Sequence, residues 1–247
     1  MIREHLFSKA VTTDKYFRWR GGDVTRLEGF SDTVFGFALT LLVVSLEVPQ
    51  TLDQLLRTMR GFMAFAVCFT FLTWIWYEHC LFFRRYGLQD ALTVFLNAVL
   101  LFLILFYIYP LKFLFTALFN EIPFFNAGGP TLNYTRPEQV TALMIIYSIG
   151  FLFIFSTFFL LHLRAYRKRN QLELDEIEMV QTIGRIRANS IAIGIALISI
   201  AISVFGGERV AGFAGMVYGL MGPAYAVNGY VVGRRLTEAL KRSVDNS

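Results

Sequence analysis

The sequence predicts an all-α integral membrane protein with six transmembrane helices. Of its 247 residues, 55% are hydrophobic, 16% are aromatic and only 17% are charged, and the mean hydropathy is +0.53. Soluble domains contain about 25% charged residues. The apolar excess is arranged in blocks long enough to cross about 30 Å of hydrocarbon, which favours a bilayer over a large soluble core.

Six apolar blocks follow one another along the chain, and we place the spans at 27–47, 59–80, 90–111, 139–162, 188–205 and 210–232. The fifth is the clearest, because SIAIGIALISIAISVF carries no charge. The sixth has glycines spaced for close helix contact, namely Gly212, Gly215, Gly219 and Gly222. Three prolines and an adjacent pair of glycines predict an irregular loop over 112–138.

Lysine and arginine are distributed unevenly between the two sides of these spans. With the N-terminus inside, 18 of them fall on the inner side and five on the outer side. We therefore expect a cell-membrane protein whose six-helix domain, 27–232, lies between a cytoplasmic segment 1–26 and a cytoplasmic tail 233–247. A mixed-charge helical linker near 164–187 is also expected inside. Because the basic residues lie between apolar blocks, nucleic acid is not an expected partner.

Motifs for cofactors, metals and catalysis are missing from the sequence. It has no glycine-rich phosphate loop, no paired Cys or His spacing and no TVGYG filter. Cys68 and Cys80 lie about 18 Å apart along one predicted helix, too far for a disulfide within it. We expect no cofactor, no bound metal and no enzyme activity.

The first span contains an acid where a carboxylate is costly. An ionised Asp near a helix centre costs about 2.5–3.5 kcal/mol on insertion scales. Arg26 and Asp32 are six positions apart and are poor helical neighbours, so another helix should contribute a partner. The second span returns to the same depth with Trp76, Glu78 and His79. This predicts an Arg26–Asp32–His79 network, which either only holds two helices together or also serves a function.

An apolar stripe follows the acid in the same span. Helical offsets of four and seven from Phe37 reach Leu41 and Val44, and Thr40 lies beside them. Taken alone, the stripe is typical of a lipid-facing or core surface. Periodicity does not make it the lining of a pore.

The three first spans resemble the TMEM175 family of lysosomal and prokaryotic potassium channels. The residues that carry the resemblance are Arg26-x-x-x-Phe30-Ser31-Asp32, Trp76-x-x-His79 followed by Leu81-Phe82, and Leu96-Asn97 with Tyr109-Pro110. The likeness covers about the first 110 residues, and the rest agrees only in the number and spacing of spans. The RxxxFSD motif is specific for the family because it stands at the start of the first span.

The resemblance implies a single-repeat chain that forms a homotetramer, with first-span helices around a central pore. It implies a passive, potassium-preferring cation channel whose filter is a stack of hydrophobic side chains. The narrowest ring would fall on Phe37, with Leu41 and Val44 outward of it and Thr40 nearby. The partners would be potassium ions, in the pore only transiently, the lipid bilayer and copies of the chain. The family usually has Ile or Leu at the position of Phe37.

The resemblance also implies a structural polar network behind the pore. Its residues in this chain would be Arg26, Phe30, Ser31, Asp32, Trp76 and His79.

Two other functions stay open at this stage. In a proton-coupled secondary transporter, Asp32 and His79 would be a protonation pair, although the sequence has no inverted repeat or broken helix of the transporter kind. In a non-conducting structural membrane protein, Phe37 would be a plug. An intramembrane enzyme ranks last, because no nucleophile–base pair appears.

Overall fold

The computed structural model describes residues 17–44, 49–128, 131, 137–206 and 211–245. The described residues contain helices, turns and loops, and no strand. The long helices are α2 (Arg26–Val44), α4 (Phe62–Tyr86), α5 (Ala91–Asn120), α6 (Pro137–Arg167), α7 (Glu176–Phe205) and α9 (Met221–Asp245). Shorter pieces are α3 (Leu52–Arg60), α8 (Ala211–Met216) and the 3-10 turns η1 (Pro123–Phe125) and η2 (Val217–Leu220). The predicted all-α class is confirmed.

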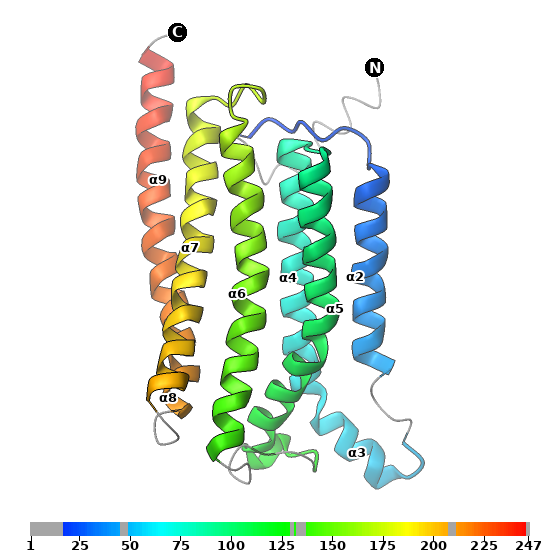
Figure 1. Ribbon diagram of the computed structural model, residues 1–247. Helices are drawn as coiled ribbons and strands as arrows, with labels where there is room; N and C mark the ends of the chain where they lie inside the picture. The colour runs from blue at the N-terminus through cyan, green and yellow to red at the C-terminus, as the bar shows by residue number, and fades with distance from the viewer. Residues whose placement is uncertain (1–16, 45–48, 129–130, 132–136, 207–210, 246–247) are drawn as a thin grey trace.

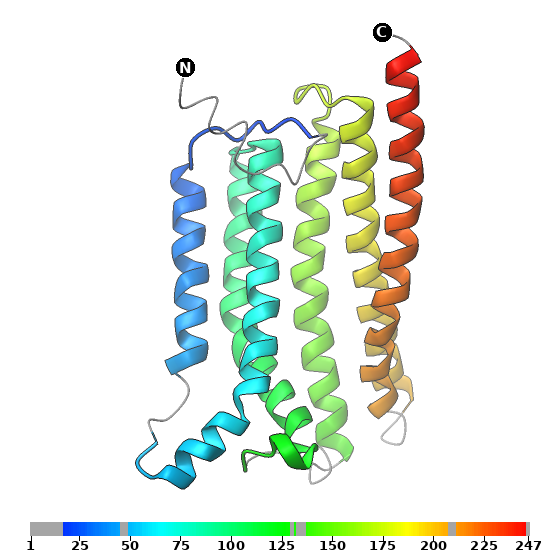
Figure 2. The same cartoon turned by 180° about the vertical axis from the view of Figure 1, so that it is seen from behind.

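The long helices stand side by side with alternating directions (Figures 1 and 2). In Figure 1, α9 and α7 lie at one side, α6 follows, α4 and α5 come next, and α2 stands at the other side. The upper end in that view holds residues 17–25, the α4–α5 turn and the α6–α7 loop, and we call it the upper end throughout. The helix α3 lies obliquely at the opposite, lower end.

Four of the described helices are long and apolar enough to cross a membrane, judged by length and composition. They are Phe62–Tyr86, Ala91–Asn120, Gln139–Arg167 and Glu176–Phe205. These four contain the predicted second to fifth spans almost entirely. Because α2 and α9 are not among them, the first and sixth spans stay predictions.

The predicted third span ends too early. The helix α5 continues through Pro110 to Asn120, so the irregular loop expected over 112–138 was wrong for its first nine residues. Proline removes one backbone donor, but the helix offers the only internal hydrogen-bonding pattern for an apolar segment in lipid, and proline is tolerated there. The apolar run that follows Pro110 therefore keeps the helix going.

The predicted sixth span is not one helix. Its described part starts as α8, passes through the turn η2 and continues as α9 to Asp245, beyond the expected end at 232. Four residues of 3-10 turn, Val217–Leu220, separate the two helices. The expected linker near 164–187 is also divided, because α6 ends at Arg167 and α7 begins at Glu176.

Charged residues tie the helix ends together at the upper end. Asp90, the N-cap of α5, accepts hydrogen bonds from Arg164 of α6 and from Thr93, and Lys168 lies 3.4 Å away. The Arg164 guanidinium holds the pKa of the Asp90 carboxyl below its ordinary value. The start of α5 and the end of α6 are thereby joined.

The helices α5 and α6 approach each other closely at Gly150. A Cβ at this position would lie 2.3 Å from a ring carbon of Tyr107 on α5. The Tyr107 side chain is buried, and its position is fixed by its hydroxyl, which donates to the Tyr147 carbonyl at 3.1 Å. Glycine at 150 therefore sets the distance between the two helices.

We expect Gly150→Ala to destabilise the folded chain by about 1–3 kcal/mol, the usual cost of overpacking. The added methyl must displace the Tyr107 ring and break its hydrogen bond. Thermal unfolding in detergent, followed by size-exclusion chromatography, measures the effect. Gly194→Ala is the matched control, because nothing lies within 4 Å of a Cβ at that helical position. Equal melting temperatures for the two variants would contradict the prediction.

Candidate functional site

The two sides of α2 differ in burial. One side packs on α4 and α5, and its buried residues recur at helical spacing: Ser31, Phe35, Ala38 and Leu42. On the opposite side Phe30 and Phe37 are 60% and 57% exposed, and Thr33 and Thr40 are exposed between and after them. No described residue of the chain covers this second side, which we call the open face of α2.

The expected constriction residues lie on or beside the open face. Phe37 and Thr40 are on it, and Leu41 is half-buried at its border. Val44 is the last residue of α2, and its side chain lies outside the described residues. The Thr40 hydroxyl donates to the Phe37 carbonyl at 2.7 Å, so its oxygen keeps lone pairs that can accept from water or contact a cation.

A chain of hydrogen bonds joins three helices behind the open face. The Ser31 hydroxyl donates to the Leu27 carbonyl at 2.8 Å and accepts from the Asn97 amide at 2.9 Å. The side-chain amide oxygen of Asn97, Oδ1, lies 2.7 Å from His79 Nε2. Because that oxygen can only accept, Nε2 carries the proton. All three side chains are buried, and together they join α2, α5 and α4.

Asp32 pairs with an indole instead of a cation. Its Oδ1 accepts from Trp76 Nε1 at 2.8 Å, with the Cys80 thiol 3.9 Å away. No hydrogen bond or ion pair joins Arg26 to Asp32 or to His79 among the described residues, so the expected three-residue network is not found. Positions six apart lie about 120° from each other around a helix. Arg26 therefore faces away from the contact between α2 and α4.

The start of α2 has a reciprocal cap. Thr25 Oγ1 accepts from the Glu28 backbone at 3.2 Å, and the Glu28 carboxylate accepts from the Thr25 backbone at 2.9 Å. This capping box fixes where the helix begins. Its signature, Thr-x-x-Glu, was readable in the sequence. Phe30, which the resemblance placed in the polar network, lies on the open face and not in the network.

Asn97 is the main residue of the site whose role was not predicted from the sequence. It appeared only as part of Leu96-Asn97, with no partner assigned. The signal was a lone amide in an apolar run, since a buried amide needs hydrogen-bond partners from other helices. Its partners, Ser31 and His79, were both named.

Glu78 also has a partner that was not foreseen. It accepts two hydrogen bonds from Arg185 of α7, at 2.7 and 2.8 Å, on a different side of α4 from Trp76 and His79. This pair borders a cavity of about 470 Å³ between α4, α6, α7 and α9. The cavity is not lined by any residue of α2.

Metal-binding groups do not gather in the described part of the chain. No cluster of three or more His, Cys, Asp or Glu side chains there could hold an ion. Cys68 and Cys80 are free thiols.

Comparison with known sequences gives a consistent result. A family model described as the endosomal/lysosomal potassium channel TMEM175 matches residues 26–107, which contain α2, α4 and the first half of α5. A protein of Marivirga tractuosa named as a potassium channel is 36% identical over 244 residues, which is 96% of this chain and 98% of that protein.

Comparison with solved structures agrees. A crystal structure of a variant of the potassium channel MtTMEM175, in complex with a nanobody fusion, matches with a TM-score of 0.79 and 36% identity, over 91% of this chain and 100% of that one. A lysosomal potassium-selective channel TMEM175 homolog from Chamaesiphon minutus matches with a TM-score of 0.52 at 22% identity, over 85% of this chain and 96% of that one. The second likeness concerns the fold alone.

Proposed function

This chain belongs to the TMEM175 family, and on that premise we propose that it is a passive, potassium-preferring cation channel. The family is one of ion channels, so the chain is not an enzyme. The Marivirga tractuosa protein and the MtTMEM175 structure, each of which matches over most of the chain at 36% identity, carry the name potassium channel.

The open face of α2 is the observation that supports a pore. A helix that packs on its own chain with one side only has its other side available to lipid or to further copies of the chain. Two exposed threonines alternate with phenylalanines on this face. Their hydroxyl oxygens can contact ions or water in a pore, whereas lipid chains form no hydrogen bonds with them. We assign the open face to the lining of the pore.

The constriction follows from that assignment. Phe37 is the bulkiest residue in the middle of the open face, with Thr40 one turn below it and Leu41 at the border. We propose that a ring of Phe37 side chains forms the narrowest point, with Thr40, Leu41 and Val44 next along the pore. An apolar ring controls ion passage through its radius, because a narrow apolar gap loses its water.

Assembly and topology complete the proposal. Since α2 is a single helix, a closed pore needs several copies, and we propose a homotetramer with the open faces around the central axis. We also propose that α2 and α9 cross the membrane, giving six spans in the cell membrane. The upper end would face the cytoplasm, because the basic residues concentrate there.

A bi-ionic measurement tests the function. The purified protein is reconstituted in a planar bilayer with potassium on one side and sodium on the other, and the reversal potential is read. We expect a current without any second substrate, reversing toward the potassium equilibrium potential. Protein-free bilayers are the control. A flux that saturates and requires a proton gradient would point to a carrier instead, and folded protein without any cation flux would contradict both.

A further inference from the structure

Residues 17–22, which we call the strap, lie across the upper end before α2 begins (Figure 1). They have no helical structure, yet Phe17 is 5% exposed and Arg20 is largely buried. Three residues, 23–25, separate the strap from the first residue of α2. The position of the strap therefore bears directly on the upper end of the helix that carries the open face.

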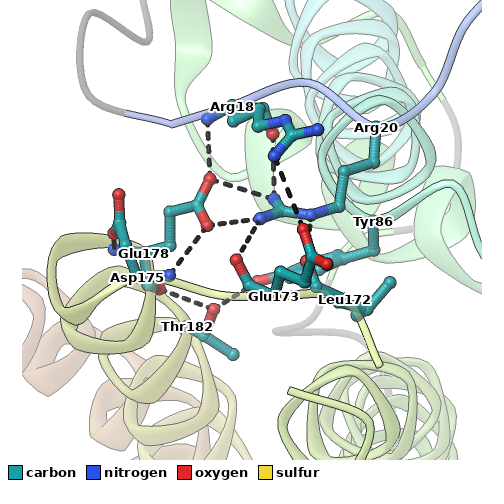
Figure 3. A network of polar contacts seen from close by, with 8 residues as sticks. All are labelled: Arg18, Arg20, Tyr86, Leu172, Glu173, Asp175, Glu178 and Thr182. Carbon is teal, nitrogen blue, oxygen red and sulfur yellow. Dashed lines mark hydrogen bonds and ion pairs between the residues drawn. The ribbon is translucent and has the colours of Figure 1, made fainter. Parts of the chain in front are cut away.

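Arg20 anchors the strap to the α6–α7 loop and to α7 (Figure 3). Its guanidinium binds both carboxylate oxygens of Glu178, at 2.5 and 2.9 Å, and the side chains of the pair are 12% and 1% exposed. The carbonyls of Leu172, Glu173 and Arg18 accept three further hydrogen bonds, at 2.5, 3.0 and 3.0 Å. These contacts match the five N–H donors of an arginine side chain.

Glu178 is held in place by its own helix. It forms a capping box with Asp175, in which the Glu178 backbone donates to Asp175 Oδ1 at 2.7 Å and the Glu178 carboxylate accepts from the Asp175 backbone. The carboxylate also accepts from the Arg18 backbone at 2.7 Å. One buried carboxylate thus accepts from the backbone at the start of α7 and also fixes the strap (Figure 3).

A second set of contacts fixes the strap to the end of α4. The backbone N–H groups of Arg20 and Gly21 both donate to the Arg84 carbonyl, at 3.1 and 2.9 Å. A Cβ at position 21 would lie 2.8 Å from the Phe83 carbonyl oxygen and 2.9 Å from Arg84 Cα. Because both atoms belong to the backbone, only glycine fits there without a shift of the strap.

We propose that the Arg20–Glu178 pair is a positioning element that holds the upper end of α2 and favours the open pore. The helix α2 packs on α4 and α5, and α7 stands on the far side of them (Figures 1 and 2). The strap therefore pulls the upper end of α2 toward the body of its own chain and away from its open face. Release lets that end move toward the pore axis and narrow it. This inference rests on the proposed function.

Single-channel recording of Glu178→Gln tests the proposal. Glutamine keeps the capping box, because an amide oxygen also accepts from the backbone, but it removes the charge that holds Arg20. We expect the open probability to fall about tenfold, which corresponds to about 1.4 kcal/mol in the open–closed equilibrium. The unitary current and the reversal potential should stay as in wild type. Glu176→Gln is the control, because Glu176 pairs with Arg242 on the surface, away from the strap.

A second pair of variants loosens the strap without touching a charge. Gly21→Ala should lower the open probability in the same direction, whereas Gly22→Ala should not, because nothing lies within 4 Å of a Cβ at position 22. Open probability counts only channels that are folded and conducting, so a loss of protein alone does not change it. An unchanged or increased open probability in both test variants overturns the proposal.

Two further results have defined meanings. If neither Glu178→Gln nor Gly21→Ala gives any conducting channels while both controls conduct, the strap serves folding and the proposal is wrong. If the wild-type protein itself passes no potassium, the proposed function fails first, and the question of open probability does not arise.

Discussion

Replacing Phe37 with alanine is expected to increase the unitary potassium current several-fold and to weaken the discrimination between potassium and sodium. Each copy of the chain would lose one phenyl ring from the narrowest point of the proposed pore. A wider apolar gap stays wet for longer, and ions that keep more of their water are distinguished less well. The effect should be among the largest of any single substitution, because all copies change at the same level.

The measurement is a single-channel recording with potassium and sodium on opposite sides, which gives current and reversal potential together. Phe153→Ala is the matched control. Phe153 lies on α6 and is 52% exposed, close to the 57% of Phe37, but it belongs to no part of the proposed pore. Wild-type current and selectivity in Phe37→Ala would remove Phe37 from the constriction, and an equal change in Phe153→Ala would mean that the effect is general.

The position of the long helices was predictable because the physical signal is local. The backbone of an uninterrupted apolar run must form its hydrogen bonds within the run when it lies in lipid, so it forms a helix. The limits of the run therefore indicate where the helix lies. The ends were harder. The third span was predicted to end at 111, although the apolar residues that follow favour continuation of the helix to Asn120. The turn η2 contains Gly219 and is followed by Gly222 and Pro223, which are residues typical of a helix break, but we interpreted the glycines of this segment only as spacing for close helix contact.

The polar residues of the site were predicted better than their pairing. Antiparallel spans place residues at the same membrane depth side by side, and Trp76, which was expected at the depth of Asp32, does donate a hydrogen bond to it. Depth does not tell which side of a helix faces which neighbour, so Arg26 and His79 were paired with Asp32. The partner of Asp32 is instead Trp76, and that of His79 is Asn97. The contact of Arg20 with Glu178 joins residues 158 positions apart. No local pattern indicates that pairing.

Asn97→Leu is expected to be the most damaging change in the polar chain behind the open face. It removes the hydrogen bonds of Asn97 to Ser31 and to His79, and it leaves His79 Nε2 buried without a partner. Interhelical hydrogen bonds in membranes contribute between about 0.6 and 2 kcal/mol each, so two of them predict a loss of about 1–4 kcal/mol. Unfolding in detergent, with recovery of the assembled oligomer as a second readout, measures this loss.

A double-mutant cycle separates the hydrogen-bond chain from simple packing. Ser31→Ala alone should cost less than Asn97→Leu, because it removes one of the two bonds. Once Ser31 is alanine, Asn97→Leu has only the His79 bond left to break, so the two losses should sum to more than the double variant loses. Ala98→Leu is the control for added bulk, since Ala98 is the exposed neighbour on α5. Strict additivity would show that Ser31 and Asn97 are not coupled, and that α2 and α5 are not joined through this hydrogen bond.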